Sequence, residues 1–557
     1  MLTIFLNWIY ILFTVFCLGF AFSRFVRKVL HYQIKRVDSI LMSGLIIATA
    51  YAQIFSLFYR VNIEANIILI AVCVLLCIIM RKEMLRFIRD SFGECSMCRR
   101  ILILLLLFAW CYYTSRGYRP PDMDGYHGQS IRWIEEYGVV KGLGILSSRL
   151  GYNSSIFAAS ALYSMKPFLG VSLHAVNGFI AFLLSVTALD LGRCFKRRKM
   201  LLSDYARVGA VYYLTTIIDE VLTPSSDYAV MCTIFFIVIK WLTQLEDPDE
   251  ERRSNIAPYA LLCVAGAHAL TLKVTAGLIL ILIVKPAYRL LREKRWKEIG
   301  IYLLLGLLVA VPWMTRTVII TGWLFYPLPE LDLFNFDWKM PEYLLHVDAF
   351  QIKVWAKGTN DTGNPSAGIA EWFPNWFRDE IFATEKLLIL ADIAAEFLCV
   401  VVAVYVFIKR QWEKLDIILV LAAVACSYTY WQLTAPMMRY GYAYVLLLVA
   451  LMAGYLLQYS RMIVKVAYVF LVVYGVYKLY ICVDEIIQSG HGPYYVWQET
   501  YDVYEVESYE VDGVTFYYNP LGDAVGYEAF PAVFGEDYTF ELRGDSIKDG
   551  FRPRKEF

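Results

Sequence analysis

Long apolar runs separated by short polar stretches dominate the pattern of the chain. A bilayer core about 30 Å thick needs about 20 apolar residues per helix. The first run, 4–22, lacks a basic leader and a small-residue cleavage site, so we expect it to remain as a helix. The pattern predicts an all-α polytopic membrane protein with about fourteen transmembrane helices, at 4–22, 39–59, 66–80, 101–114, 171–189, 206–222, 227–243, 257–271, 274–287, 299–319, 386–408, 415–432, 440–458 and 463–482.

Basic residues gather in alternate connections between these runs. Cytoplasmic loops of membrane proteins are enriched in Lys and Arg, and alternation across fourteen spans puts all of the basic connections on one side. The basic connections are 23–36, 81–100, 193–199, 289–297 and 409–414. The opposite, extracytoplasmic side would then receive three polar segments, 115–170, 322–385 and 483–557.

The polar segments contain patterns of their own. "YHGQSIRWIEEY" (126–137) has an apolar and aromatic face opposite its charges, which is typical of a helix lying in the membrane interface. "SIFAASALYSM" (155–165) is apolar but too short to span, so it predicts a second interfacial or re-entrant helix. "YEVESYEVDGVTFYYN" (504–519) alternates around an Asp-Gly pair, which predicts a β-hairpin in a small C-terminal segment.

Composition supports the membrane prediction and excludes other classes. The chain is 59% hydrophobic and 18% charged, whereas soluble domains carry about 25% charged residues. Its net charge of +1 gives no reason to expect a nucleic-acid partner. Most of the 12 cysteines fall in or beside apolar runs, so we expect no disulfide framework. Cys95 and Cys98 form a CxxC without a second pair or a nearby histidine, and we interpret them as unpaired thiols.

Two carboxylates follow directly after an apolar run. "PPDMDGYHGQS" (120–130) contains Asp122 and Asp124, and Pro120 and Pro121 would end the preceding span. The aspartates could lie in a solvated loop, with one of them capping the next helix. They could instead act as a general base beside a lipid-embedded cavity, because a carboxylate can take a proton from an attacking hydroxyl.

His127 also lies in this stretch, either as a structural histidine or as a hydrogen-bonding partner for the site. Two acids and one histidine on one turn are weak grounds for a metal, and a water-filled polar pocket explains them equally. We therefore expect no cofactor, with a divalent metal as the alternative.

Several cations lie within or beside apolar runs. Charges in such places are costly and raise a functional hypothesis. Lys273 could reach the membrane surface along its stem or bind an anionic group. Arginine suits phosphate because its planar fork bonds two oxygens. The arginines in question are Arg149, Arg316 and Arg439.

Asp227 is a further acidic candidate, beside an apolar run as the cations are. It begins the span 227–243 and could mark a tight turn or contact a polar substrate. Together these groups suit a ligand with a lipid tail between helices, a phosphate beside the cations and a polar head facing carboxylates and aromatic rings.

The chain resembles GT-C glycosyltransferases in several sequence motifs. The resemblance rests on "PPDMDGYHGQSIRWIEEYG" (120–138), on "PWMTRTVIITGWLFYPLP" (312–329), and on "TAPMMRYGYAY" and "LRGDSIKDGFRP", which resemble a group of bacterial membrane proteins placed with that superfamily. It spans roughly residues 101–557. It implies three extra N-terminal helices in 1–100, a GT-C-like core in 101–482 and an extracytoplasmic C-terminal segment in 483–557.

The resemblance also implies an activity. A sugar would pass from a polyprenyl-phosphate or diphosphate donor to a glycan or lipid acceptor on the extracytoplasmic face of a bacterial plasma membrane, with inversion. Asp124 matches the family's acidic base best, and Asp122 is the second choice. Arg316 and Lys273 match donor-phosphate positions loosely. The stabilisation of charge on the leaving phosphate would come from such cations.

Two other functions remain open. A glycan polymerase or ligase would use similar lipid-linked saccharides but relies on arginines in a long outer loop. A transporter or flippase for lipid-linked sugars should show internal repeats and a site at the membrane midplane. The polar candidates cluster at one face instead, which counts against transport.

Overall fold

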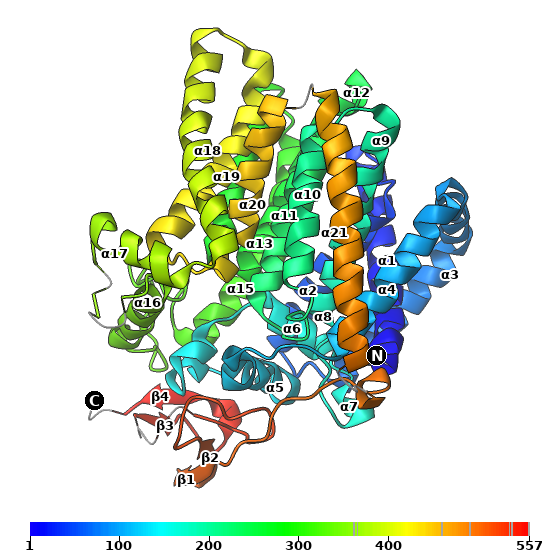
Figure 1. Ribbon diagram of the computed structural model, residues 1–557. Helices are drawn as coiled ribbons and strands as arrows, with labels where there is room; N and C mark the ends of the chain where they lie inside the picture. Colours follow the sequence, from blue (N-terminus) through cyan, green and yellow to red (C-terminus); the bar gives the residue numbers. More distant parts are fainter. Residues whose placement is uncertain are drawn as a thin grey trace.

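The computed structural model describes residues 1–359, 363–364, 366–457, 460–488, 492–533, 535 and 539–554. Over these residues the chain is mostly helical and contains 12 helices that are long and apolar enough to cross a membrane. Figure 1 shows them as one bundle with a small β region at its lower end. The protein is thus a multi-pass membrane protein by the length and composition of its helices.

The candidate spans begin with α1 (Leu2–Leu30), α2 (Val37–Ser56), α3 (Ile63–Glu94) and α4 (Met97–Ser115). The next are α8 (Val176–Ala188), continued by η4 (Leu189–Gly192) and α9 (Arg193–Arg197), then α11 (Ser226–Leu245), and η5 (Val274–Ile283) running into α14 (Val284–Arg292). The last are α15 (Trp296–Thr321), α18 (Ala383–Ile408), α19 (Leu415–Thr434), preceded by η7 (Trp412–Lys414), α20 (Met438–Leu457) and α21 (Arg461–Gln488).

The shorter helices are α5 (Gly128–Glu136), α6 (Ser155–Tyr163), α7 (Lys166–Leu169), α10 (Leu202–Thr216), α12 (Glu250–Ser254), α13 (Ala257–Leu272), α16 (Glu342–Ala356) and α17 (Ile369–Asn375). Short 3-10 and π turns complete the helical elements: η1 (Met123–His127), η2 (Leu143–Ile145), η3 (Ser148–Gly151), η6 (Trp376–Glu380), η8 (Gly492–Tyr495) and η9 (Ile547–Asp549). The strands are β1 (Glu507–Val511), β2 (Val514–Tyr518), β3 (Phe540–Leu542) and β4 (Phe551–Pro553).

Twelve of the fourteen predicted spans coincide with these long apolar helices. The other two, 206–222 and 257–271, correspond to the shorter α10 and α13, of 15 and 16 residues. The total of fourteen spans therefore stays a prediction.

Two helices cross in close contact through glycines. A Cβ atom on Gly19 of α1 would lie 1.9 Å from the Ile40 carbonyl oxygen, and one on Gly44 of α2 would lie 1.7 Å from that of Val15. Small residues allow such close backbone approach in membrane bundles. Helix α2 also packs against α6, α8 and α15, so the N-terminal helices are part of the bundle. The predicted boundary at residue 100 is not tested by this packing.

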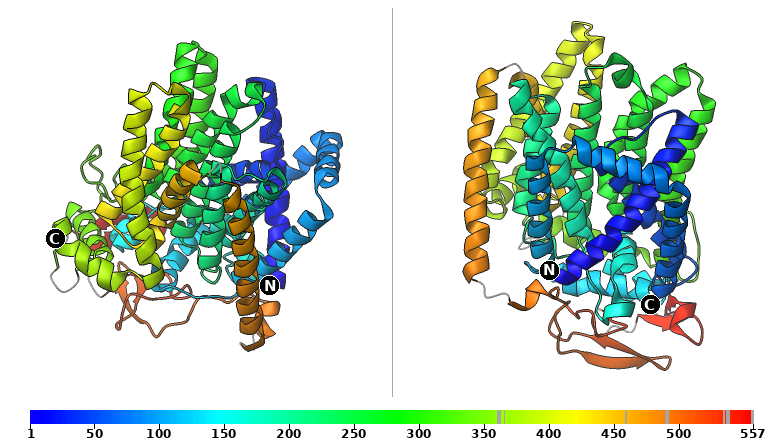
Figure 2. Two further views of the ribbon diagram at one scale, coloured as in Figure 1. Left: turned by 45° about the horizontal axis from the view of Figure 1, so that its top comes forward. Right: turned by 90° about the vertical axis from the view of Figure 1, so that its right-hand side faces the viewer.

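The polar segments lie together at one end of the bundle. Helices α5, α7, α16 and α17 and the strands lie at the lower end, whereas α9, α12 and the α18–α19 connection lie at the upper end (Figure 1). Figure 2 shows from two further sides that the β region lies beneath the helices, with α21 at the edge of the bundle. The predicted clustering of the three polar segments is therefore confirmed, although which side of a membrane they face stays a prediction.

The C-terminal segment contains the predicted hairpin. Strands β1 and β2 pair antiparallel, with Val511 opposite Val514. Asp512 and Gly513 turn between them with φ of 50° and 80°, the conformation that an Asp-Gly pair adopts in a two-residue hairpin. Beside them β3 and β4 form a second pair, and Phe516, Phe540 and Phe551 share a core with Trp133.

The two predicted interfacial helices exist, but both are covered by protein. All nine residues of α6 are buried, and α6 packs between α2, α5 and α8. Helix α5 is held by the C-terminal segment, because Gln129 Nε2 donates to the carbonyl oxygens of Gly526 and Ala529, each at 2.8 Å. The amphipathic pattern of 126–137 thus reflects burial against residues far away in the chain.

Candidate functional site

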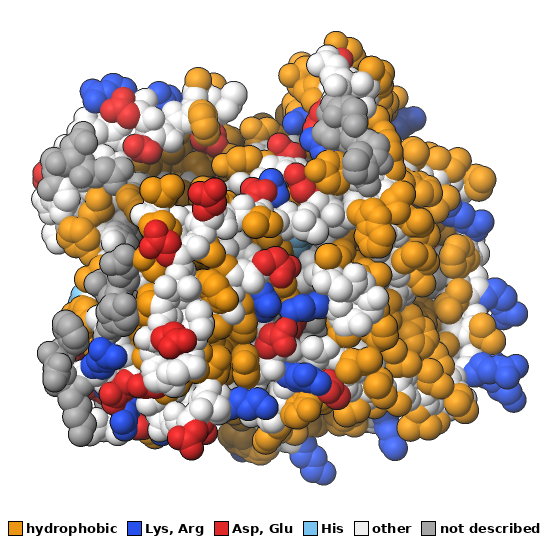
Figure 3. All heavy atoms as spheres, turned by 90° about the horizontal axis from the view of Figure 1, so that it is seen from below, with side chains coloured by type: hydrophobic (Ala, Val, Ile, Leu, Met, Phe, Trp, Pro, Cys, Tyr) orange, Lys and Arg blue, Asp and Glu red, His pale blue; other side chains and the backbone are white. Residues whose placement is uncertain are grey.

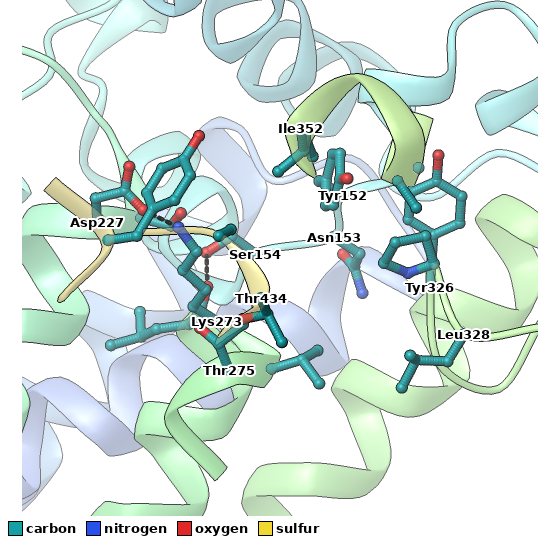
Figure 4. A pocket seen from close by; sticks show the side chains of 18 of the residues that line it. Tyr152, Asn153, Ser154, Asp227, Lys273, Thr275, Tyr326, Leu328, Ile352 and Thr434 are labelled. Carbon is teal, nitrogen blue, oxygen red and sulfur yellow. Dashed lines mark hydrogen bonds and ion pairs between the residues drawn. The ribbon is translucent and has the colours of Figure 1, made fainter. Parts of the chain in front are cut away.

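A cavity of about 410 Å³ opens at the lower end of the bundle. Its walls come from the loops after α4 and η3, the start of α11, the end of α13, and helices α15, α16, α19 and α20. The charged lining residues are Asp122, Asp227, Lys273, Glu330, Lys353 and Arg439, and the aromatic ones include Tyr126, Tyr152, Trp313, Tyr326, Trp431, Tyr440 and Tyr444. Figure 4 shows Asp227 and Lys273 on one side of this cavity, with Tyr326 and Leu328 on the other.

Helix ends deliver the charged groups to the cavity. Helix α13 ends at Leu272, and Lys273 is extended, with φ −155° and ψ 125°, before the chain resumes as η5. The Ser154 hydroxyl donates to the Leu272 carbonyl oxygen at 2.7 Å, which satisfies a backbone group that the break releases. Asp227 lies in the first turn of α11, where the helix dipole favours a carboxylate. Arg439 lies in the first turn of α20.

Four of these side chains form a chain of ion pairs. Arg439 Nη2 lies 2.7 Å from Asp122 Oδ2, and Arg439 Nε lies 3.7 Å from Asp227 Oδ2. Lys273 Nζ pairs with Asp227 Oδ1 and lies 3.5 Å from the centre of the Tyr440 ring. Two carboxylates therefore neutralise two cations, so an anionic ligand would have to take over contacts that the carboxylates now make.

The environment keeps Asp122 ionised at neutral pH. Burial raises the pKa of its carboxyl, but the Arg439 guanidinium and other nearby cations outweigh burial, so the pKa lies below its ordinary value. His127 behaves differently, because burial lowers the pKa of its imidazole to about 4 despite the nearby Asp122 and Asp227. The imidazole is therefore neutral at pH 7. It packs against the rings of Tyr126 and Phe157.

Asp124 does not line the cavity. It is 4% exposed, and its carboxylate accepts hydrogen bonds from the Asp502 amide at 3.1 Å and the Tyr504 hydroxyl at 3.4 Å. Its carbonyl oxygen accepts from the amides of Val525 and Gly526. Burial raises the pKa of its carboxyl. Asp124 therefore fastens the C-terminal segment, and of the two aspartates in this stretch only Asp122 lines the cavity.

Two predicted phosphate ligands lie behind the cavity wall. Arg316 is 2% exposed, and its Nε donates to Asn153 Oδ1 at 3.0 Å while its Nη1 donates to the Ser56 hydroxyl. Because Asn153 lines the cavity, Arg316 acts on the site by holding that amide. Arg149 lies 2.9 Å from Asp523 of the C-terminal segment, outside the cavity lining.

The structure brings other side chains to the cavity that the sequence analysis does not single out. Tyr152 lines it, and the Tyr152 hydroxyl donates to Asp348, which also accepts from the Ser148 hydroxyl at 3.2 Å. Tyr152 and Asn153 lie in the stretch 147–155, and Tyr440 follows Arg439 directly. Their closeness in sequence to the candidate arginines Arg149 and Arg439 is the feature that could have pointed to these three residues. Asp348 carries no such signal.

The surrounding face of the molecule mixes both charges. Viewed from below in Figure 3, acidic and basic side chains alternate across the middle of this end, while hydrophobic side chains dominate its right-hand side. Within the part of the chain that the structure describes, no three His, Cys, Asp or Glu residues group as metal ligands would.

The chain belongs to a protein family. The family described as "Domain of unknown function (DUF8201)" matches residues 1–446 as one unit, which includes every cavity-lining residue. No curated protein and no solved structure matches the chain. The matched region therefore contains the whole cavity lining and the candidate spans from α1 to α19.

Proposed function

We propose that the protein is an integral membrane glycosyltransferase of the GT-C type. It moves a sugar from a polyprenyl-phosphate or diphosphate donor to a glycan or lipid acceptor on the extracytoplasmic face, in cell-surface glycan assembly of a bacterial plasma membrane. The observation that carries the proposal is the chain Asp122–Arg439–Asp227–Lys273 in a cavity at one end of an apolar bundle.

The cavity offers the parts that such a ligand needs. Apolar groups of α16, Leu345, Ala349 and Ile352, recur at helical spacing along one wall and suit a hydrocarbon chain. Arg439 and Lys273 suit the phosphate, since guanidinium and ammonium groups both bind phosphate oxygens. The ring faces of Tyr126, Tyr152 and Tyr326 suit a sugar.

In the proposed reaction Asp122 is the base. A phosphate that binds Arg439 would withdraw the guanidinium from Asp122 and restore basicity to a carboxylate that Arg439 now holds in its ionised form. Asp122 then takes the proton from the acceptor hydroxyl, whose oxygen bonds to the anomeric carbon as the bond to the phosphate oxygen breaks. The electron pair leaves with the lipid phosphate, where Arg439 and Lys273 stabilise it.

The test is donor turnover by purified protein in detergent or nanodiscs. Polyprenyl-phosphate sugars are supplied with a glycan acceptor, and release of polyprenyl phosphate is measured. Loss of a general base typically lowers the rate about 10²–10⁴-fold. The Asp122→Asn variant should therefore release polyprenyl phosphate more slowly by that factor. Asp249→Asn, an exposed cap of α12 at the opposite end, is the matched control.

Two outcomes contradict the proposal. If Asp122→Asn releases polyprenyl phosphate as fast as the unaltered protein, Asp122 is not the base. If no donor is consumed but lipid-linked sugar crosses the bilayer of reconstituted vesicles, the protein is a transporter and the cavity is a gate of its path.

A further inference from the structure

At the end of the bundle opposite the cavity, three guanidinium groups meet at one buried carboxylate. Asp190 lies in η4, and its side chain is 2% exposed. Its Oδ2 lies 2.6 Å from Arg36 Nη2, and its Oδ1 lies 2.6 Å from Arg99 Nη1 and 3.5 Å from Arg193 Nη2. Arg36 precedes α2, Arg99 lies in the first turn of α4, and Arg193 begins α9. One carboxylate therefore gathers cations from the ends of three helices.

A second buried carboxylate extends this group. Asp38, in the first turn of α2, has its Oδ2 3.0 Å from Arg36 Nη2 and 2.6 Å from Nζ of Lys240 in α11. Its Oδ2 also accepts a hydrogen bond from the Thr187 hydroxyl at 3.1 Å. We call these two aspartates, with the three arginines and Lys240, the Asp190 network. In it four cations share two carboxylates, which leaves two positive charges in excess.

The ion pairs of the adjoining helix α10 do not remove this excess. Asp204 pairs with both Arg197 and Arg207, so it too has one carboxylate for two cations. Glu246, whose carboxylate accepts from the Ser203 amide at 3.2 Å, supplies one further negative charge. The two groups together still contain two more cations than carboxylates. A cluster of one sign of charge attracts ions of the opposite sign.

The arginines of the Asp190 network can be reached from outside the protein. The Arg193 side chain is 61% exposed, and those of Arg36 and Arg99 are 33% and 26% exposed. Within the described part of the chain, the contact with Asp190 is the one ion pair that Arg193 forms. The buried carboxylate also holds Arg36 and Arg99 in place, so a ligand would meet guanidinium groups that are already oriented.

We propose that Arg36, Arg99 and Arg193 bind the phosphate of an anionic phospholipid at the upper end of the bundle, where Figure 1 shows α9. Guanidinium groups suit phosphate oxygens, and basic sites between helices on the cytoplasmic side bind anionic headgroups. Apolar surface for the acyl chains follows on α4, where Leu102 and Leu105, within two turns of Arg99, are 42% and 60% exposed. This lipid site does not depend on the proposed glycosyl transfer.

The test measures thermal unfolding of the full-length protein in detergent micelles, in which phosphatidylglycerol replaces phosphatidylcholine stepwise at constant total lipid. A ligand that binds only the folded state raises the midpoint in a saturable way. We expect phosphatidylglycerol to raise the midpoint by about 1–3 °C at saturation. Inorganic phosphate at equal ionic strength should not reproduce this rise, because it lacks the acyl chains. An equal rise with inorganic phosphate, or no rise with phosphatidylglycerol, overturns the proposal.

Variants assign the rise to the Asp190 network. Arg193→Gln removes an exposed cation and should increase the half-saturating mole fraction of phosphatidylglycerol about five-fold, and Arg99→Gln should increase it as well. Arg292→Gln removes an exposed cation from the basic connection 289–297, on the same predicted side, and should titrate as the unaltered protein does. An unchanged half-saturating fraction in Arg193→Gln or Arg99→Gln overturns the proposal. An equal increase in Arg292→Gln also overturns it, because the lipid would then respond to the general charge of this end.

Discussion

Arg439 lies between two carboxylates and contacts both, with Asp122 Oδ2 at 2.7 Å from Nη2 and Asp227 Oδ2 at 3.7 Å from Nε. The two acids lie about 100 residues apart in the chain, Asp122 in the loop that follows α4 and Asp227 at the start of α11. A single guanidinium therefore joins three parts of the cavity wall. Its planar fork can serve both partners at once, which an ammonium cannot do as well.

Two substitutions of Arg439 should distinguish the effect of its positive charge from the effect of its planar, forked shape. Arg439→Lys keeps the charge but not the fork, so we expect donor turnover to fall about 10–100-fold with little loss of stability. Arg439→Met leaves two carboxylates to one lysine and should destabilise the protein by about 1–3 kcal/mol, because a hydrogen-bonded charge loses its partner. Turnover and thermal unfolding measure the two effects. A methionine variant as stable and active as the unaltered protein would contradict this assignment.

Attachment of the C-terminal segment should weaken as the pH rises. Burial raises the pKa of Glu135, whose carboxylate accepts from the Tyr527 and Ser172 hydroxyls, and burial also raises that of Asp124. The folded state then binds more protons than the unfolded chain, whose carboxyl pKa is about 4. The contribution is complete below the unfolded pKa and is lost as the pH rises through the folded pKa.

Hydrogen exchange of residues 499–530, corrected for intrinsic rates, measures this attachment. We expect protection to decrease as the pH is raised from about 4 toward neutrality. Glu135→Gln cannot ionise and should remove its share of the dependence. Protection that increases with pH would mean that these carboxylates stabilise the segment in their ionised form.

Two glycines of the first polar segment form a matched pair. A Cβ on Gly128 would lie 2.8 Å from a ring carbon of Tyr501, which is too close, whereas one on Gly125 would lie 3.6 Å from Arg149 Nη1, an ordinary contact. Gly128→Ala should therefore displace Tyr501 and destabilise the segment by about 1–3 kcal/mol. Gly125→Ala should be tolerated. Limited proteolysis within residues 499–530 compares them, and equal cleavage rates would contradict the predicted clash.

Accessibility labelling tests the topology. Single cysteines introduced in a cysteine-free background at Ser546 and Ser366, both exposed, should react with an impermeant thiol reagent added outside intact cells. A cysteine at Lys199, in a basic connection, should react only after the membrane is permeabilised. Labelling of Ser546 and Lys199 positions from the same side would overturn the arrangement in which the cavity faces outward.

Local patterns predicted much of the fold. The apolar runs located every long helix, and the Asp-Gly pair at 512–513 located the hairpin turn. Asp122, Asp227, Lys273 and Arg439 were identified because charges beside apolar runs are costly, and the structure brings all four together. Their pairing depends on how α20 packs beside the loop after α4, which no local pattern contains.

The remaining differences between the sequence-based predictions and the structure also arise from contacts between distant parts of the chain. Asp124 looked like the better base because it abuts a helix, but residues 502–526 cover it, and a contact across that separation leaves no trace in nearby sequence. The apolar neighbours of Arg316 suggested a phosphate ligand, but its buried guanidinium donates hydrogen bonds to Asn153 and Ser56 instead.

The contact of Asp124 with Asp502 has a consequence for how the protein is made. The two residues are separated by 378 positions, so a ribosome must add most of the chain before the first polar segment can acquire its cover. Until then α5 keeps an apolar and hydrogen-bonding face open, and domains under synthesis are prone to aggregate through such faces. The lower end can therefore be completed only after residues 502–526 have been synthesised.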